Sequence, residues 1–348
     1  MSTLETGIDE RHDGAPVAPA PSRRFNGRGL SGASLTVGIA AIFVFQALGP
    51  TSRVSYLAIS IGIFAIAGSG LAVLYGDCGQ MSVAHGAIIG LGAYATVYGI
   101  QKGMAPGLAV VVSVVVGVAA ATLVGIPSRR LQGHYFVITT FAAAEAMSVI
   151  ATNTGGFGGP AGISLPAGSS FLRTQSGLYY TVFGTLVVIV IVRSLLQRTS
   201  FGSGLIAIRE NEKLARSLGV PTGRYKTLAF VVSGGICGLA GFLFAFANQY
   251  VSPDDVGSAP GITLVLILIL GGSRYWLGPI IGAAVYFLLP YIFPLSAVQN
   301  QFAIGVMLVV VVLLLPQGIV GTAAGLLGNR RAGRSSPVED ASTAEGTG

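Results

Sequence analysis

Charge is scarce in this sequence. Only 9% of its 348 residues are Asp, Glu, Lys or Arg, whereas a soluble domain carries roughly 25%. So few charges cannot coat a water-exposed surface on a chain of this length, which excludes an ordinary soluble globular protein. Cysteine is also scarce, since Cys78 and Cys237 are the only two and lie far apart in apolar sequence. They do not indicate a disulfide framework.

Clusters typical of an enzyme are absent as well. The three histidines, His12, His85 and His134, are scattered, and no Cys/His spacing of a metal site occurs. No convincing Ser-His-Asp arrangement can be assembled, and the phosphate-binding pattern G-x-x-x-x-G-K-[ST] is missing. We therefore expect no enzymatic activity and no cofactor bound by this chain.

Apolar sequence dominates instead. Hydrophobic residues make up 52% of the chain, the mean hydropathy is +0.74, and several apolar runs are long. A bilayer-spanning helix needs about 20 such residues. Alternating strand patterning is absent, and the 51 glycines fit close packing between membrane helices. The composition predicts an all-α polytopic membrane protein.

Ten apolar segments can be drawn along the chain. The eighth is short and could form a re-entrant pair with the ninth, so we expect eight to ten spans. We expect a membrane domain over 29–325, with disordered cytoplasmic tails at 1–28 and 326–348. The segments are 30–48, 54–75, 82–101, 104–126, 135–151, 178–197, 227–250, 260–272, 276–294 and 300–321.

The distribution of Lys and Arg predicts the orientation. With a cytoplasmic N-terminus, all but three of the 20 Lys and Arg residues fall on the cytoplasmic side. The exceptions are Arg53, Lys102 and Arg173. The positive-inside rule therefore predicts that both termini are cytoplasmic. This topology also explains the net charge of +7, so the basic balance does not call for a nucleic-acid partner.

A polar segment, 202–226, interrupts the apolar sequence on the cytoplasmic side. Glycines and Pro221 bound a predicted helix over 205–218, in which Glu212 and Arg216 form an i,i+4 pair. The helix could rest on lipid headgroups or dock on a cytoplasmic partner. Its mixed charge signs favour docking, because a helix on a membrane surface prefers Lys and Arg to Glu.

Two further segments carry polar residues at membrane depth. In 75–95, five glycines accompany Asp77, Gln80, Ser82 and His85. Such sequence is typical either of a tightly packed helix pair or of a broken helix that lines a transport pathway. Glu145 lies inside the segment 135–151, where an unpaired carboxylate costs at least about 2.5–3.5 kcal/mol. It is therefore either a tether to a neighbouring helix or a pathway residue.

Five ordered blocks of sequence carry a family resemblance. They resemble the membrane permease of branched-chain amino acid ABC importers, the LivM type, over roughly residues 54–320. The turn Ser273–Pro279 departs from that pattern, which more often has GSLWGP there. The blocks are GQMSVAHGAIIGLGAYA (79–95), LQGHYFVITTFAAAE (131–145), TGGFGGPAGI (154–163), GLIAIRENEKLARSLGV (204–220) with YKTLAFVVSGGICGLAGFLFAFANQYVSP (225–253), and LILGGSRYWLGPIIGAAV (268–285).

The resemblance implies a multi-pass subunit in the bacterial cytoplasmic membrane. Its partners would be a second homologous permease, two cytoplasmic ATPase subunits that use ATP and Mg, an external solute-binding protein and membrane lipid. Helix 205–218 would be the coupling helix that contacts the ATPase, through Arg209, Glu210, Asn211, Glu212 and Arg216. The candidates for the substrate pathway are Gln80, Ser82, His85, Tyr94, Thr139 and Glu145.

The sequence leaves alternatives open for both the substrate and the energy source. No Lys or Arg lies near the middle of a predicted span, so the expected solute is neutral or zwitterionic. Branched-chain amino acids, urea and short amides all satisfy this condition. An ATPase-independent transporter or channel would need Glu145, Asp77 or His85 as its ion site. A membrane scaffold without transport would leave the polar segment 75–95 unexplained.

Overall fold

The computed structural model describes most of the membrane domain. The predicted first span, 30–48, and both predicted tails lie outside the described residues. The described residues are 49, 51–131, 133–155, 158–168, 170–292, 296–315 and 317–323.

Helices occupy the other nine predicted segments, which confirms the all-α prediction. Their ends differ from the predicted ends by up to seven residues, the largest difference being at the end of α12. These helices are α2 (Ser52–Ala72), α3 (Ala84–Gln101), α4 (Pro106–Ser128), α5 (His134–Asn153), α6 (Gln175–Gln197), α9 (Thr222–Asn248), α10 (Ser258–Gly271), α11 (Gly278–Ile292) and α12 (Ala297–Leu314). Between α6 and α9 lie two shorter helices, α7 (Ser200–Glu210) and α8 (Glu212–Ser217).

Short elements complete the described chain. A π-helical turn, η1 (Val73–Asp77), extends α2. The strands β1 (Ile163–Ser164) and β2 (Tyr250–Val251) pair antiparallel, with Ile163 opposite Val251. Three 3₁₀ turns are η3 (Gly159–Ala161), η4 (Phe171–Arg173) and η5 (Pro253–Val256).

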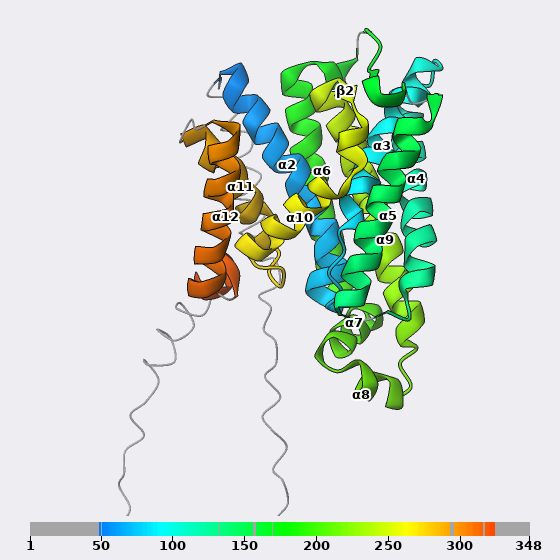
Figure 1. Cartoon of the computed structure of the whole chain (residues 1–348), viewed down its shortest axis with the longest axis vertical. Coiled ribbons are helices and arrows are strands. Elements are labelled where there is room, and N and C mark those ends of the chain that lie inside the picture. Colours follow the sequence, from blue (N-terminus) through cyan, green and yellow to red (C-terminus); the bar gives the residue numbers. More distant parts are fainter. Residues whose placement is uncertain are drawn as a thin grey trace, which may run out of the picture.

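Among the described residues, five helices are long and apolar enough to cross a membrane: α2 with η1, α4, α5, α6 and α9. Helix α3 packs against α4 and α9, and α2 packs against α6, α9 and α11 (Figure 1). Figure 1 also shows α7 and α8 together at one end of the bundle, which is the predicted cytoplasmic end, and β2 at the other. Large apolar side chains on the outer surface of α4, such as Val115 and Leu123, remain exposed as expected of a face toward lipid.

Glycines of α3 allow its neighbours to approach backbone to backbone. A Cβ on Gly86 would overlap the backbone of Gly261 in α10, and one on Gly90 would overlap Asp255 in η5. A Cβ on Gly92 would likewise overlap the Gly238 carbonyl in α9. The tightly packed helix pair was one of two interpretations of this segment, and the structure shows that packing for α3.

The eighth apolar segment forms α10, which follows a stretch that is not α-helical and packs against the ninth segment, α11. After α9 the chain forms β2 and η5 before α10 begins, so the first part of its return is not α-helical. Along this return, Asp255 lies beside Gly90 and Gly261 beside Gly86. The chain thus runs alongside α3 toward the end that carries α7 and α8. Helix α10 therefore begins inside the bundle.

Gly86→Ala tests this packing. The added methyl group has no room against Gly261, so we expect the variant to lose about 1–3 kcal/mol of stability, as overpacked cores do. Gly184→Ala in α6 is the control, because open space surrounds that exposed glycine. The measurement is the fraction of monodisperse protein after heating in detergent. Equal melting of the two variants would contradict the close approach.

Candidate functional site

The segment predicted to be cytoplasmic forms two helices, α7 and α8, and not the single predicted helix over 205–218. Asn211 interrupts it with an extended backbone, at φ −158° and ψ 102°. The Asn211 side chain accepts a hydrogen bond from the Leu214 N–H at 3.0 Å and so caps α8. Asparagine favours this capping position over a helix interior, and that preference breaks the predicted helix.

The five predicted coupling residues do not share one surface. Glu212 forms ion pairs with Lys226 at 2.5 Å and with Arg216 at 3.2 Å, and the Lys226 side chain is only 3% exposed. Arg209 points inward and donates to the carbonyl oxygen of Gly76 in η1. Thus Glu212 and Arg209 attach α8 and α7 to the membrane helices.

Other side chains of the same segment point outward. The Glu210 side chain is 60% exposed, and its hydrogen bond from Arg209 at 2.8 Å lowers the pKa of its carboxyl group. Arg216 is 68% exposed despite its pair with Glu212. Leu214 and Leu218 on α8 are also exposed, although neither was predicted as a contact residue. Two large apolar side chains among charges on a polar surface are typical of a protein contact.

A buried ion pair that sequence analysis missed lies close to α7. Arg193 of α6 meets Asp77 of η1, with Nη2 3.5 Å from Oδ1, and both residues are buried. Gln197 donates to the same Asp77 oxygen at 2.8 Å, and Arg193 donates to the carbonyl of Ser273 at 3.1 Å. The pair joins three elements. Its sequence signal is an arginine inside the apolar segment 178–197, since a buried charge needs a counter-charge.

Three of the six pathway candidates lie in packed interior. Ser82, His85 and Tyr94 are each at most 1% exposed. One ring nitrogen of His85 is 3.0 Å from the Ser82 hydroxyl, and the other is 2.5 Å from the Ser233 hydroxyl of α9. These contacts join α3 to α9 and satisfy the polar groups that the packing buries.

Glu145 lies on an exposed surface of α5. Six exposed residues recur at helical spacing and form one stripe, which we call the α5 face: Tyr135, Ile138, Ala142, Glu145, Ala146 and Val149. The Glu145 Oε1 atom accepts a hydrogen bond from the backbone N–H of Ser258, the first residue of α10, at 3.1 Å. The N-terminus of a helix attracts a carboxylate, so this bond ties α5 to α10.

Gln80 and Thr139 lie toward the N-terminal end of α5, which is the predicted cytoplasmic end. Gln80 lines a cavity of about 430 Å³ together with Ile138 of the α5 face and His134. Thr139 is partly buried, and its hydroxyl donates to the Tyr135 carbonyl within α5 at 2.8 Å. Gln80 is itself only 9% exposed, but it differs from the buried Ser82, His85 and Tyr94 in lining this cavity beside the α5 face.

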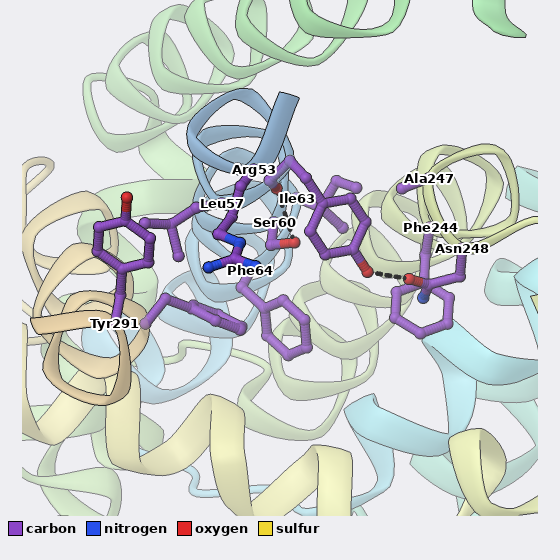
Figure 2. A pocket seen from close by; sticks show the side chains of 11 residues that line it. Arg53, Leu57, Ser60, Ile63, Phe64, Phe244, Ala247, Asn248 and Tyr291 are labelled. Atoms are coloured by element: carbon purple, nitrogen blue, oxygen red, sulfur yellow. Dashed lines mark hydrogen bonds between the residues drawn. The ribbon is translucent and has the colours of Figure 1, made fainter. Parts of the chain in front are cut away.

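A second cavity, of about 410 Å³, lies at the opposite end of the bundle between α2, α9 and α11. Its walls are mostly aromatic and aliphatic. Figure 2 shows Arg53 reaching across it between Tyr291 and Asn248, and the Tyr56 hydroxyl donates to Asn248 Oδ1 at 2.6 Å. Among the described residues, no three His, Cys, Asp or Glu side chains come together to hold a metal ion.

Comparison with known sequences assigns the chain to a protein family. The family described as "Branched-chain amino acid transport system / permease component" matches residues 53–315. The chain belongs to this family. It is therefore a permease component and a multi-pass membrane protein, and the resemblance found in the sequence is confirmed.

Two relatives illustrate the range of this permease family. The high-affinity branched-chain amino acid transport permease LivM of Escherichia coli K12 is 29% identical over 287 residues, 74% of this chain and 68% of that protein. The autoinducer 2 import permease LsrC of Salmonella typhimurium is 35% identical over 132 residues, 36% of this chain and 37% of that protein. No solved structure matches the chain.

Asp77→Ala tests the buried ion pair of this permease. The substitution leaves Arg193 buried without a counter-charge, which typically costs about 3–5 kcal/mol. We expect a clear loss of thermal stability in detergent. Asp254→Ala removes an exposed carboxylate and should leave stability within about 0.5 kcal/mol of wild type. An Asp77→Ala protein that melts with wild type would contradict the pairing.

Proposed function

We propose that this permease carries branched-chain amino acids, or a small solute of similar charge, across the bacterial cytoplasmic membrane as a subunit of an ABC importer. The match to the permease family carries the proposal. The name of the relative LivM and the absence of Lys and Arg from the centres of the spans support a zwitterionic substrate. Urea and short amides are the alternative substrates, because they too lack a net charge.

In this proposal, the energy comes from other chains. Two cytoplasmic ATPase subunits bind ATP and Mg, a second homologous permease completes the membrane part, and an external binding protein delivers the solute. The positive-inside rule predicts that both termini lie in the cytoplasm. The missing G-x-x-x-x-G-K-[ST] pattern supports this division of labour, because the pattern's backbone and lysine hold nucleotide phosphates.

Helices α7 and α8 form the proposed contact with the ATPase. Leu214 and Leu218 face away from the bundle, flanked by the exposed Arg216. On the inner side, Arg209 binds the Gly76 carbonyl and Glu212 binds Lys226 of α9. A displacement of α8 by the ATPase would therefore reach η1 and α9 through hydrogen bonds between rigid helices.

The double substitution Leu214→Ala with Leu218→Ala tests this contact. If the two leucines lie at the centre of the contact, each truncation costs about 1 kcal/mol or more, so we expect ATPase affinity to fall about tenfold or more. Both side chains are exposed, so membrane insertion and melting should stay unchanged. Leu123→Ala, on the exposed surface of α4, is the control. ATPase binding at wild-type affinity by the double variant would reject the docking role of α8.

Gentle affinity purification from the native membrane tests the assembly as a whole. We expect an ATPase with a phosphate-binding loop and a second permease to copurify with this chain. Recovery of the chain alone, from membranes in which such ATPases are present, would contradict the importer. Uptake by the chain alone in liposomes under an imposed ion gradient would then identify an ion-coupled transporter.

A further inference from the structure

We propose that Glu145 selects the charge of the transported solute. Its carboxylate meets the ammonium group of a zwitterionic solute within the membrane and repels anions. This inference rests on the proposed transport function and names the substrate chemistry that the α5 face recognises.

The depth of Glu145 is the first argument. It is the only Asp, Glu, Lys or Arg in α5, and it lies 11 residues after His134, the first residue of the helix. At 1.5 Å per residue it is about 16 Å along a helix of about 30 Å, which matches the hydrocarbon core of a bilayer. A carboxylate exposed at that depth is unfavourable against lipid. The α5 face must therefore meet water or another protein surface.

The local geometry fixes the carboxylate but leaves it accessible. Oε1 accepts the Ser258 N–H, and no residue in the described part of the chain donates to Oε2. The neighbouring Ala142 and Ala146 are exposed and present only methyl groups beside the carboxylate. One oxygen is thus held by the scaffold, while the other can accept a hydrogen bond from a passing ammonium group.

The surrounding charge favours a positive group. The helices α3, α5 and α10 and the turn η5 contain no Lys or Arg, and Asp254 of η5 is a further exposed carboxylate. Opposite charges attract strongly where water is sparse. An ammonium group would be drawn to Glu145, while an anionic solute would find no positive side chain on these elements.

The α5 face also leads from Glu145 to a space large enough for a small solute. Ile138 lies two helical turns before Glu145 on the same face and lines the cytoplasmic cavity of about 430 Å³. Gln80 contributes an amide to that cavity. A solute released from Glu145 would therefore move along the face into a space with a neutral polar group, from which it can leave toward the cytoplasm.

Glu145→Gln separates this role from a structural one. Glutamine keeps an oxygen that can accept the Ser258 N–H but removes the negative charge. In the complete complex reconstituted with its ATPases and binding protein, we expect leucine uptake to fall roughly tenfold. ATP hydrolysis stimulated by the binding protein should continue at the wild-type rate. Ser148→Ala is the control, because it removes a hydrogen bond to Pro253 at the same junction without changing charge. Wild-type uptake by Glu145→Gln would overturn the proposal.

A second experiment needs neither leucine nor ATPase. Cysteine introduced by Ala142→Cys or Ala146→Cys is treated, in native membranes, with cationic and anionic methanethiosulfonate reagents. Native background should be low, because Cys78 and Cys237 are both buried. After correction for their rates with a free thiol, the cationic reagent should react roughly tenfold faster, as in a cleft lined by one sign of charge. Adding Glu145→Gln should abolish that preference.

The two experiments separate two kinds of failure. A cysteine that reacts with neither reagent, or a preference that survives Glu145→Gln, overturns the role of Glu145. If the wild-type complex fails to take up leucine while the preference persists and depends on Glu145, the charge selectivity holds. The proposed branched-chain substrate is then wrong.

Discussion

The need to pair every backbone polar group inside a membrane governs this structure. Helices meet that need internally, but the β2–η5 stretch before α10 does not. Other parts of the chain supply several of its hydrogen-bond partners instead. Strand β2 pairs with β1, the Asp255 carboxylate accepts from the Ser252 backbone at 2.8 Å, and Glu145 binds the free N–H of Ser258. The glycines of α3 make room for this stretch. The glycine-rich sequence and the Glu145 carboxylate thus both support the stretch of chain that leads into α10.

Local sequence predicted the helices because the apolar runs and the bilayer thickness together fix their lengths. It also predicted that Glu145 could not lie against lipid, from the energy of a carboxylate at that depth. Sequence could not decide between tether and pathway residue, and the structure shows both a bond to Ser258 and an exposed position. The break at Asn211 was missed because the favourable Glu212–Arg216 spacing exists equally within one long helix or within α8 alone.

Local sequence could not predict which groups pair with the buried charges. Asp77 and Arg193 are 116 positions apart, and Glu212 and Lys226 belong to separate helices. Only the packing of α2, α6 and α9 brings such groups together. Helix packing also decides the surroundings of the polar residues in 75–95, since His85 faces α9 and Gln80 faces α5. Two polar groups that lie only five positions apart in one segment therefore have different surroundings.

The π-helical turn Val73–Asp77 places Asp77 opposite Arg193. A π-turn contains one residue more than an α-helical turn, so it marks a one-residue insertion in the span. A deletion inside this turn would return it to α-helical geometry and leave the residues beyond it nearly in phase. A deletion earlier in α2, in contrast, would rotate everything beyond it by about 100° around the helix axis. Asp77 and the Gly76 carbonyl that binds Arg209 would then both lose their partners. The residue count between the start of α2 and the π-turn therefore fixes both of these contacts.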